Sequence, residues 1–192
     1  MKYNDKTWPV VLGISGASGA IYGREIFDRL LGAGVPLHVV ITPTGKGILK
    51  AELGLETEYF HKPGVVVHDN SRYDSPIASG SFPTSGMVVA PCSMGCLARI
   101  AAGASTDLLE RAADVHIKER RPLVLVPRET PLSDIHLENM LRLSRAGVVI
   151  LPAMPGFTHS PGTFDDLAAF IAGRVLDQLK IPQDFAPRYG GG

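Results

Sequence analysis

A loop of small residues near the start of the sequence is the first candidate for chemistry. Residues 15–19, Ser-Gly-Ala-Ser-Gly, follow the apolar run VVLGI and precede a helical pattern. The spacing of the glycines at 13, 16 and 19 matches neither a Walker loop nor the dinucleotide fingerprint. Free backbone N–H groups and the dipole at the start of a helix attract anions. We therefore predict a phosphate site here; the alternative is a tight turn that needs glycine only for packing.

Other polar residues follow later apolar runs. Thr42 stands where a dinucleotide enzyme would carry an acid for the ribose, which favours a mononucleotide. Ser93 begins a helical pattern in Pro-Cys-Ser-Met-Gly, and this motif alone is better explained as a helix N-cap. Arg128 ends an apolar run and needs an anion, either a ligand phosphate or the neighbouring Glu129. No serine stands in Gly-x-Ser-x-Gly, so we do not expect a hydrolase of that kind.

The cysteines and histidines form no recognisable metal or redox motif. Cys92 and Cys96 have poor spacing for zinc, and we interpret them as packing thiols. His116, His136 and His159 have no carboxylate partner that is visible in the sequence. The basic run at 118–121 is most simply the solvated end of a helix.

Apolar runs alternate with amphipathic segments along the whole chain. The predicted strands cover 10–14, 35–42, 86–91, 122–127 and 148–153, with a short one at 65–67; the predicted helices cover 20–33, 44–53, 93–103, 107–121, 133–147 and 163–180. This alternation predicts a doubly wound α/β fold, an open and mostly parallel sheet with helices on both faces. We expect a single domain over residues 1–192, with a core of about residues 9–180 and a tail at 181–192. Because ligands bind such sheets at the carboxyl ends of the strands, the polar residues above should meet at one edge.

Composition excludes several classes of function. Lys plus Arg and Asp plus Glu number 19 each, so the chain has no net field for nucleic acid. No apolar run approaches the roughly 20 residues that span a bilayer, and the first residues lack a signal-peptide core. We expect a cytoplasmic protein with no nucleic-acid or membrane partner.

Five segments together resemble the UbiX-like flavin prenyltransferases. They are GISGASGAIYG, SGSFPTSGMVVAPCSMG, LLERAADVHIKERRPLVLVPRETPLSDIHLENMLRLSRAG, VVILPAMPGF and RVLDQLKIPQDFAPRYG, and they span about residues 10–189. The resemblance implies a flavodoxin-like, Rossmann-like flavoprotein that binds FMN and forms a homo-oligomer, typically a dodecamer. It implies transfer of a dimethylallyl group from dimethylallyl phosphate to N5 and C6 of reduced FMN, without a metal. The prenylated FMN then serves a UbiD-type decarboxylase.

The resemblance also assigns roles to residues of this sequence. Ser18 and Glu52 resemble a pair that handles the N5 proton. Lys118, Glu129 and Arg174 resemble the group around the donor phosphate, where Arg111 and Arg128 also belong, with Lys118 and Glu129 in catalytic roles. The residues that match FMN-binding positions are Gly16, Ala17, Ser18, Thr42, Ser93, Met94, Gly95, Cys96 and Arg128.

The sequence departs from the family pattern on the side of the prenyl donor. Thr158 stands where the family has a donor-binding Tyr, and Tyr189 where it often has Trp. Thr42 and Cys96 also replace the more usual Ser and Thr. The chain can therefore be a prenyltransferase, with this or a longer donor, or a protein that only carries FMN or prenylated FMN. A flavin-dependent cysteine-type decarboxylase ranks third, because the chain has PCSMGCLA in place of Pro-Ala-Ser-Ala-Asn-Thr.

Overall fold

The strands form one parallel sheet, as predicted. The computed structural model describes residues 8–186 and 188. Every adjacent pair of strands is parallel, and the order across the sheet is β3-β2-β1-β4-β5-β6. The strands are β1 (Val10–Ile14), β2 (Leu37–Ile41), β3 (Val65–His68), β4 (Gly86–Cys92), β5 (Leu123–Pro127) and β6 (Val149–Ile150).

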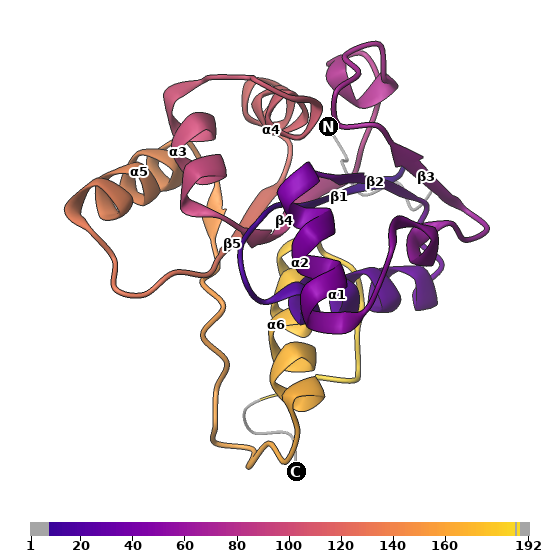
Figure 1. The fold of residues 1–192 in the computed structure, drawn as a ribbon, viewed down its shortest axis with the longest axis vertical. Helices are drawn as coiled ribbons and strands as arrows, with labels where there is room; N and C mark the ends of the chain where they lie inside the picture. Colours follow the sequence, from indigo (N-terminus) through magenta and orange to yellow (C-terminus); the bar gives the residue numbers. More distant parts are fainter. Residues whose placement is uncertain (1–7, 187, 189–192) are drawn as a thin grey trace.

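Helices cover both faces of this sheet (Figure 1). One hydrophobic core joins alternate strand residues such as Leu12 to α1, α2 and α6, and the other joins residues such as Val11 to α3, α4 and α5. The central strands are buried on both faces, which explains their continuous apolar sequence. The helices are α1 (Ala20–Gly32), α2 (Pro43–Leu53), α3 (Met94–Ala102), α4 (Leu108–Lys118), α5 (Asp134–Arg145) and α6 (Phe164–Gln178), with 3₁₀ turns at Thr57–Phe60 and Pro76–Ala78.

Several predicted elements extend past the observed bounds, and two of them are four residues too long. The helix predicted over 107–121 ends at Lys118, because Arg120 adopts a left-handed conformation with φ of 54° and Pro122 follows. The strand predicted over 148–153 is only Val149–Ile150. Pro152 lacks the N–H that a continuing ladder needs, although the N–H groups of the residues on either side of it still reach β5.

The order of the strands reverses between β1 and β4. The chain leaves β1 for α1 on one face and leaves β4 for α3 on the other. Ligands bind doubly wound sheets in the crevice at this point. Ser15 joins the two loops here, because its hydroxyl donates to the Pro91 carbonyl at 2.9 Å and accepts from the Ser93 N–H at 2.7 Å.

Candidate functional site

The loop after β1 packs closely against the start of α2. A Cβ at Gly16 would lie 2.4 Å from the Cβ of Thr44, and one at Gly45 would lie 2.6 Å from the Ile14 carbonyl oxygen. Neither position accommodates a side chain without movement of its neighbours. The glycine at 16 therefore has a packing role, and it also keeps the backbone of the loop uncovered for a ligand.

The start of α1 already holds an anion that belongs to the protein. The Glu52 carboxylate, from the end of α2, accepts the Gly19 N–H at 2.9 Å and the Ala20 N–H at 2.8 Å. The helix has no side-chain cap and no acidic residue in its own first turn. Our prediction that these N–H groups are free for a ligand phosphate is therefore wrong at Gly19 and Ala20, because a distant carboxylate satisfies them.

Glu52, Ser18 and Arg128 form the electrostatic centre of the site. Burial by itself raises the pKa of Glu52, but hydrogen bonds from the Ser18 hydroxyl and from the Ala20 and Gly19 N–H groups lower it, and the charge of Arg128 adds to them. The net pKa lies below the usual range, so Glu52 is ionised at neutral pH. The structure thus places side by side Ser18 and Glu52, the pair that the family resemblance implies.

Arg128 reaches back from the end of β5 to the first loop. Its Nε donates to the Ser18 carbonyl oxygen at 2.9 Å. Glu129 is exposed, and its carboxylate accepts the Thr130 N–H at 3.0 Å. The guanidinium is therefore positioned by its hydrogen bond to the loop and by its attraction to the Glu52 carboxylate. The N–H groups on its two terminal nitrogens can still donate to a ligand.

The helices α2 and α3 also begin at this edge of the sheet. Thr42 caps α2 by accepting the Gly45 N–H at 3.0 Å, and Ser93 caps α3 by accepting the Cys96 N–H at 3.3 Å. The N-cap interpretation of Ser93 is confirmed. Met94 is largely buried and Gly95 is exposed.

The Cys96 side chain belongs to the hydrophobic core formed with α3, α4 and α5. It lies in the core, 2% exposed, and hydrogen bonds with Cys92. That hydrogen bond and burial raise the pKa of the Cys96 thiol, so it is protonated and fills space. Only its backbone remains for the FMN role that the resemblance assigns to Cys96.

The predicted donor-phosphate residues on α4 do not join this cluster within one chain. The helix begins beside Asn70, which follows β3, where the Leu108 N–H donates to the Asn70 carbonyl at 2.9 Å. It ends at Lys118, just before β5 begins. With a rise of about 1.5 Å per residue, the helix places Lys118 about 15 Å from its first residue, towards the edge of the sheet where the strands begin. There Lys118 pairs with Glu119. Arg111, on the same helix, donates to the Ala78 carbonyl at 3.1 Å and pairs with Asp114 at 2.7 Å.

The predicted donor residues Thr158 and Arg174 lie at a third location, the loop before α6 and α6 itself. Thr158 is exposed, and Arg174 pairs with Asp177 at 3.2 Å while its side chain is 52% exposed. Asp165, in the first turn of α6, pairs at 2.5 Å with Arg24 of α1. Arg174 is nine residues further along the helix, about 13 Å from that contact. One chain therefore presents its candidate site residues in three separate groups.

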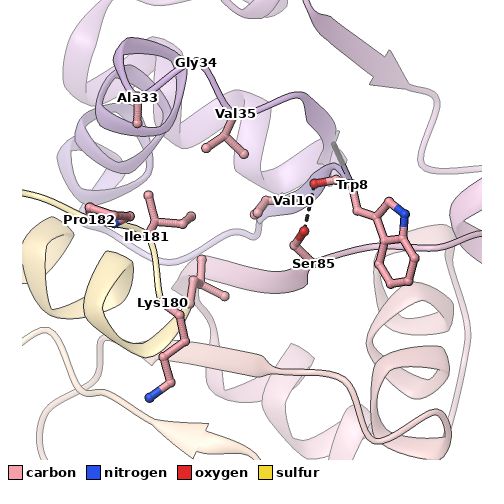
Figure 2. Close-up of a pocket in the computed structure, with 10 residues that line it drawn as sticks. Trp8, Val10, Ala33, Gly34, Val35, Ser85, Lys180, Ile181 and Pro182 are labelled. Atoms are coloured by element: carbon pink, nitrogen blue, oxygen red, sulfur yellow. Dashed lines mark hydrogen bonds between the residues drawn. The ribbon is translucent and has the colours of Figure 1, made fainter. Parts of the chain in front are cut away.

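A cavity of about 350 Å³ lies at the opposite edge of the sheet, at the start of β1 (Figure 2). Its walls are mainly apolar, with Val10, Val35 and Ile181, and Ser85 donates to the Trp8 carbonyl at its rim. None of the predicted site residues lines it. Because parallel α/β sheets bind their ligands at the carboxyl edge, we do not assign the flavin to this cavity.

Residues 8–186 and 188 contain no group of three or more His, Cys, Asp or Glu side chains arranged to hold a metal ion. Within the same residues, no helix has both the length and the apolar character that a bilayer crossing requires.

Comparison with known proteins identifies the family. The flavoprotein family model matches residues 1–176. The flavin prenyltransferase UbiX of Methanothermobacter thermautotrophicus is 51% identical over 182 residues, which are 95% of each chain. The chain belongs to the UbiX family of flavin prenyltransferases. The UbiX enzyme of Pseudomonas aeruginosa, 44% identical over 94% of this chain and 93% of its own, agrees.

Two solved structures of UbiX-like proteins share the fold over almost the whole chain. The crystal structure of AnUbiX (PadA1) in complex with FMN and dimethylallyl pyrophosphate has a TM-score of 0.92 and 39% identity, and covers 96% of this chain and 98% of its own. The dodecameric FMN-dependent UbiX-like decarboxylase of Escherichia coli O157:H7 has a TM-score of 0.90 and 42% identity, and covers 95% and 100%. The family resemblance and the flavodoxin-like fold that we predicted are thus confirmed.

Some residues that shape the site escaped the sequence reasoning. Thr44 packs on Gly16, and Tyr22 would contact a side chain at Gly19. In the sequence, these two residues are marked only by their position in the first turn of a helix that follows a glycine-rich loop or a strand. Many residues share that position, so it does not identify a site residue. His38 and His68, on neighbouring strands, share a 2.8 Å hydrogen bond that depends on a register only the sheet defines. Tyr189, one of the family departures, lies outside the described residues.

Proposed function

We propose that this protein transfers a dimethylallyl group from dimethylallyl phosphate to reduced FMN, and that the prenylated FMN is used by a UbiD-type decarboxylase. The observation that carries the proposal is the ionised Glu52, bonded to Ser18 and facing Arg128, at the point where the strand order reverses. UbiX relatives about half identical to this chain support it.

The edge of the sheet fits a flavin mononucleotide. Three helices begin there around small residues, Gly16, Ala17 and Gly95, and Arg128 has guanidinium donors to spare. Because Glu52 takes two N–H groups of α1, we assign the FMN phosphate to Arg128 and to the ends of the other two helices. Ser18, Thr42, Ser93, Met94 and the Cys96 backbone complete the proposed FMN-binding set.

Ser18 and Glu52 are arranged to handle a proton. When bound and reduced, FMN supplies the nucleophilic N5 and C6 that take the prenyl group. The Ser18 hydroxyl donates to the Glu52 carboxylate, so its oxygen can accept a proton while its own proton moves to Glu52. The hydrogen bonds from Ser18 and from the Ala20 and Gly19 N–H groups keep Glu52 ionised and ready to receive it, and the charge of Arg128 adds to their effect.

The donor side of the site requires more than one copy of the chain. Within one chain these side chains have other partners than the Ser18–Glu52–Arg128 cluster: Arg111 of α4 pairs with Asp114, Lys118 of α4 with Glu119, and Arg174 of α6 with Asp177. A neighbouring copy can bring such residues over the flavin edge, where their charges would stabilise the leaving phosphate and Glu129 would supply a proton. Met154, Phe157 and Phe164, which are 67%, 68% and 81% exposed, give the donor loop an apolar surface for such a contact. We therefore propose a homo-oligomer, a dodecamer like the E. coli relative.

One experiment tests the proposal directly. Purified protein is loaded with FMN, reduced without oxygen and mixed with dimethylallyl phosphate, and the mass of the released flavin is measured. A gain of one dimethylallyl unit is expected. Glu52→Gln should slow the reaction by about 100-fold or more, since it removes the proton acceptor, whereas Glu56→Gln in the nearby surface ion pair with Lys50 should not.

Unmodified FMN from a protein that binds it would contradict the proposal for this donor. The same mixture with geranyl phosphate then tests a longer donor, which the replacement of Tyr by Thr158 would accommodate. A flavin that stays unmodified with both donors would favour a carrier of FMN or prenylated FMN.

A further inference from the structure

A groove of about 740 Å³ lies between the last residues of α4 and α5, at the edge of the sheet where the strands begin. The first residues of β5 and β6, among them Leu123 and Val149, form part of its wall. With a rise of about 3.3 Å per residue, β5 places Leu123 about 13 Å from Pro127 at the opposite edge, where we assign the flavin. The groove is therefore separate from the proposed FMN site.

The charged side chains that line this groove are all arginines. They are Arg120, Arg121 and Arg145, and no described Asp or Glu belongs to the lining. The carboxyl ends of α4 and α5 also meet the groove, and each contributes about half a negative charge. Three full positive charges outweigh these two helix ends and leave the groove with a charge of about +2.

Two of the three guanidinium groups are available to a ligand. Arg121 is held by the backbone, because it donates to the Phe82 carbonyl at 2.7 Å and to the Gly80 carbonyl at 2.5 Å. The guanidinium groups of Arg120 and Arg145 make no hydrogen bond or ion pair with any residue that the structure describes. Both of these side chains are exposed, so they can reach a ligand without losing a protein partner.

The acid beside the groove is already paired. The Glu119 carboxylate forms an ion pair with Lys118. The hydrogen bond and the charge of Lys118 lower the pKa of Glu119, and the charge of Arg121 adds a smaller effect. Glu119 is therefore ionised at neutral pH, but Lys118 balances its charge and the groove arginines stay uncompensated.

The backbone at Arg120 shows that ending the helix does not account for this arginine. The chain turns after α4 at Arg120, with φ of 54°, and after α5 at Gly147, with φ of 89°. Glycine adopts this left-handed conformation freely, whereas any residue with a Cβ is strained there. A glycine would end α4 with less strain, so the arginine at 120 points to a use for its side chain.

The chemistry of the groove favours one class of ligand. Two free guanidinium groups match a dianion, and a phosphate monoester carries nearly two negative charges at neutral pH. Half-buried Ile117, Pro122 and Val149 add an apolar wall beside them. The volume lies within the usual range for small-molecule sites.

We propose that this groove binds a phosphate monoester with an apolar body. Arg120 and Arg145 pair with the phosphate, Arg121 adds its positive field, and the apolar body packs against the wall at Ile117. The inference goes beyond the proposed function and does not depend on it, because it uses no residue that we assign to FMN or to the prenyl donor.

The test measures binding of phenyl phosphate to the FMN-loaded protein by calorimetry at low salt. The variants are Arg120→Gly and Arg145→Gln, and the control is Arg142→Gln, in the last turn of α5 but outside the groove. Each groove variant should raise Kd about 10-fold, with FMN affinity unchanged. Arg120→Gly should also keep or raise Tm, because it relieves the strained backbone. Phenol, which lacks the phosphate, should bind all variants alike.

Several results would overturn the inference. These are a wild-type protein that does not bind phenyl phosphate at millimolar concentration, an unchanged Kd in both groove variants, or an equal rise in Arg142→Gln. If Arg120→Gly does not fold, Arg120→Asn takes its place, because asparagine also tolerates the left-handed conformation. Failure of the proposed function is distinct: a protein that does not prenylate FMN would still show or lack this difference in Kd.

Discussion

Glu52 should stabilise the fold as well as serve the proposed reaction, and the two roles can be separated. Its carboxylate is the cap of α1, contributed by α2, since Gly19, the N-cap residue of α1, has no side chain to cap the helix. Glu52→Ala removes the acceptor for two backbone N–H groups. Glu52→Gln keeps one oxygen acceptor and removes the charge.

The expected loss in the free energy of unfolding of each Glu52 variant follows from the contacts that it removes. A lost N-cap costs about 0.5–2 kcal/mol, and a lost charge at a helix N-terminus about 0.3–1 kcal/mol. Because Glu52 is exposed, we take the lower part of these ranges, about 1–2 kcal/mol for Glu52→Ala and about half of that for Glu52→Gln. The control is Glu56→Gln, which breaks a 2.6 Å ion pair with Lys50 between side chains that are 57% and 68% exposed. Such an exposed surface pair contributes little to stability.

The assay is urea unfolding at a fixed protein concentration, because assembly links stability to concentration. A slope of about 2 kcal/mol/M converts the loss in Glu52→Ala into a midpoint shift of about 0.5–1 M. The folded-state pKa of Glu52 is lowered, so its stabilisation is fully present above the ordinary carboxylate pKa of about 4.3 and disappears as the pH falls through the folded value. The difference in the free energy of unfolding between wild type and Glu52→Gln should therefore shrink only below about pH 4. A Glu52→Ala midpoint equal to that of Glu56→Gln, or a difference that persists in strong acid, would refute the reasoning.

Three further predictions concern the site and its supporting helices. Gly16→Ala should destabilise the protein by about 1–3 kcal/mol, because the new Cβ would lie 2.4 Å from the Cβ of Thr44. Adding Thr44→Gly should recover most of this lost stability, as measured by urea midpoints in a double-mutant cycle. Losses that simply add in the double variant would show that the two side chains do not clash. Arg128→Gln should weaken FMN binding about 10- to 100-fold in a fluorescence titration, with Arg128→Lys in between, and unchanged affinity would remove Arg128 from the phosphate site. Burial lowers the pKa of His116 to about 4, so the unfolded chain takes up this proton first and stability should fall by about 3 kcal/mol as the pH drops from about 6.5 to 4. His116→Asn should show a shallower fall in unfolding free energy over that range, and an equal slope would exclude His116 as the cause.

The sequence by itself determined the elements and the edge of the sheet where the candidate site lies. Continuous apolar strands such as 86–91, set between amphipathic helices, leave few arrangements other than a doubly wound parallel sheet. The cap Ser93 was visible because an N-cap acts on N–H groups two or three residues away. Local interactions of this kind join residues that are close in the sequence, so they can be predicted from short stretches of it. The family resemblance depended on long motifs, and the relatives confirmed it.

The tertiary structure decided which groups share space. Glu52 lies 33 residues from Gly19, so no local pattern shows that it fills the helix end we expected to be open. Arg128 bonds the Ser18 carbonyl across 110 residues for the same reason. The groove that Arg120 and Arg145 line exists only because α4 and α5 end beside each other in the fold. The periodicity of apolar residues indicates which face of a helix or strand is buried. The residue that this face contacts on another element depends on how the elements pack together.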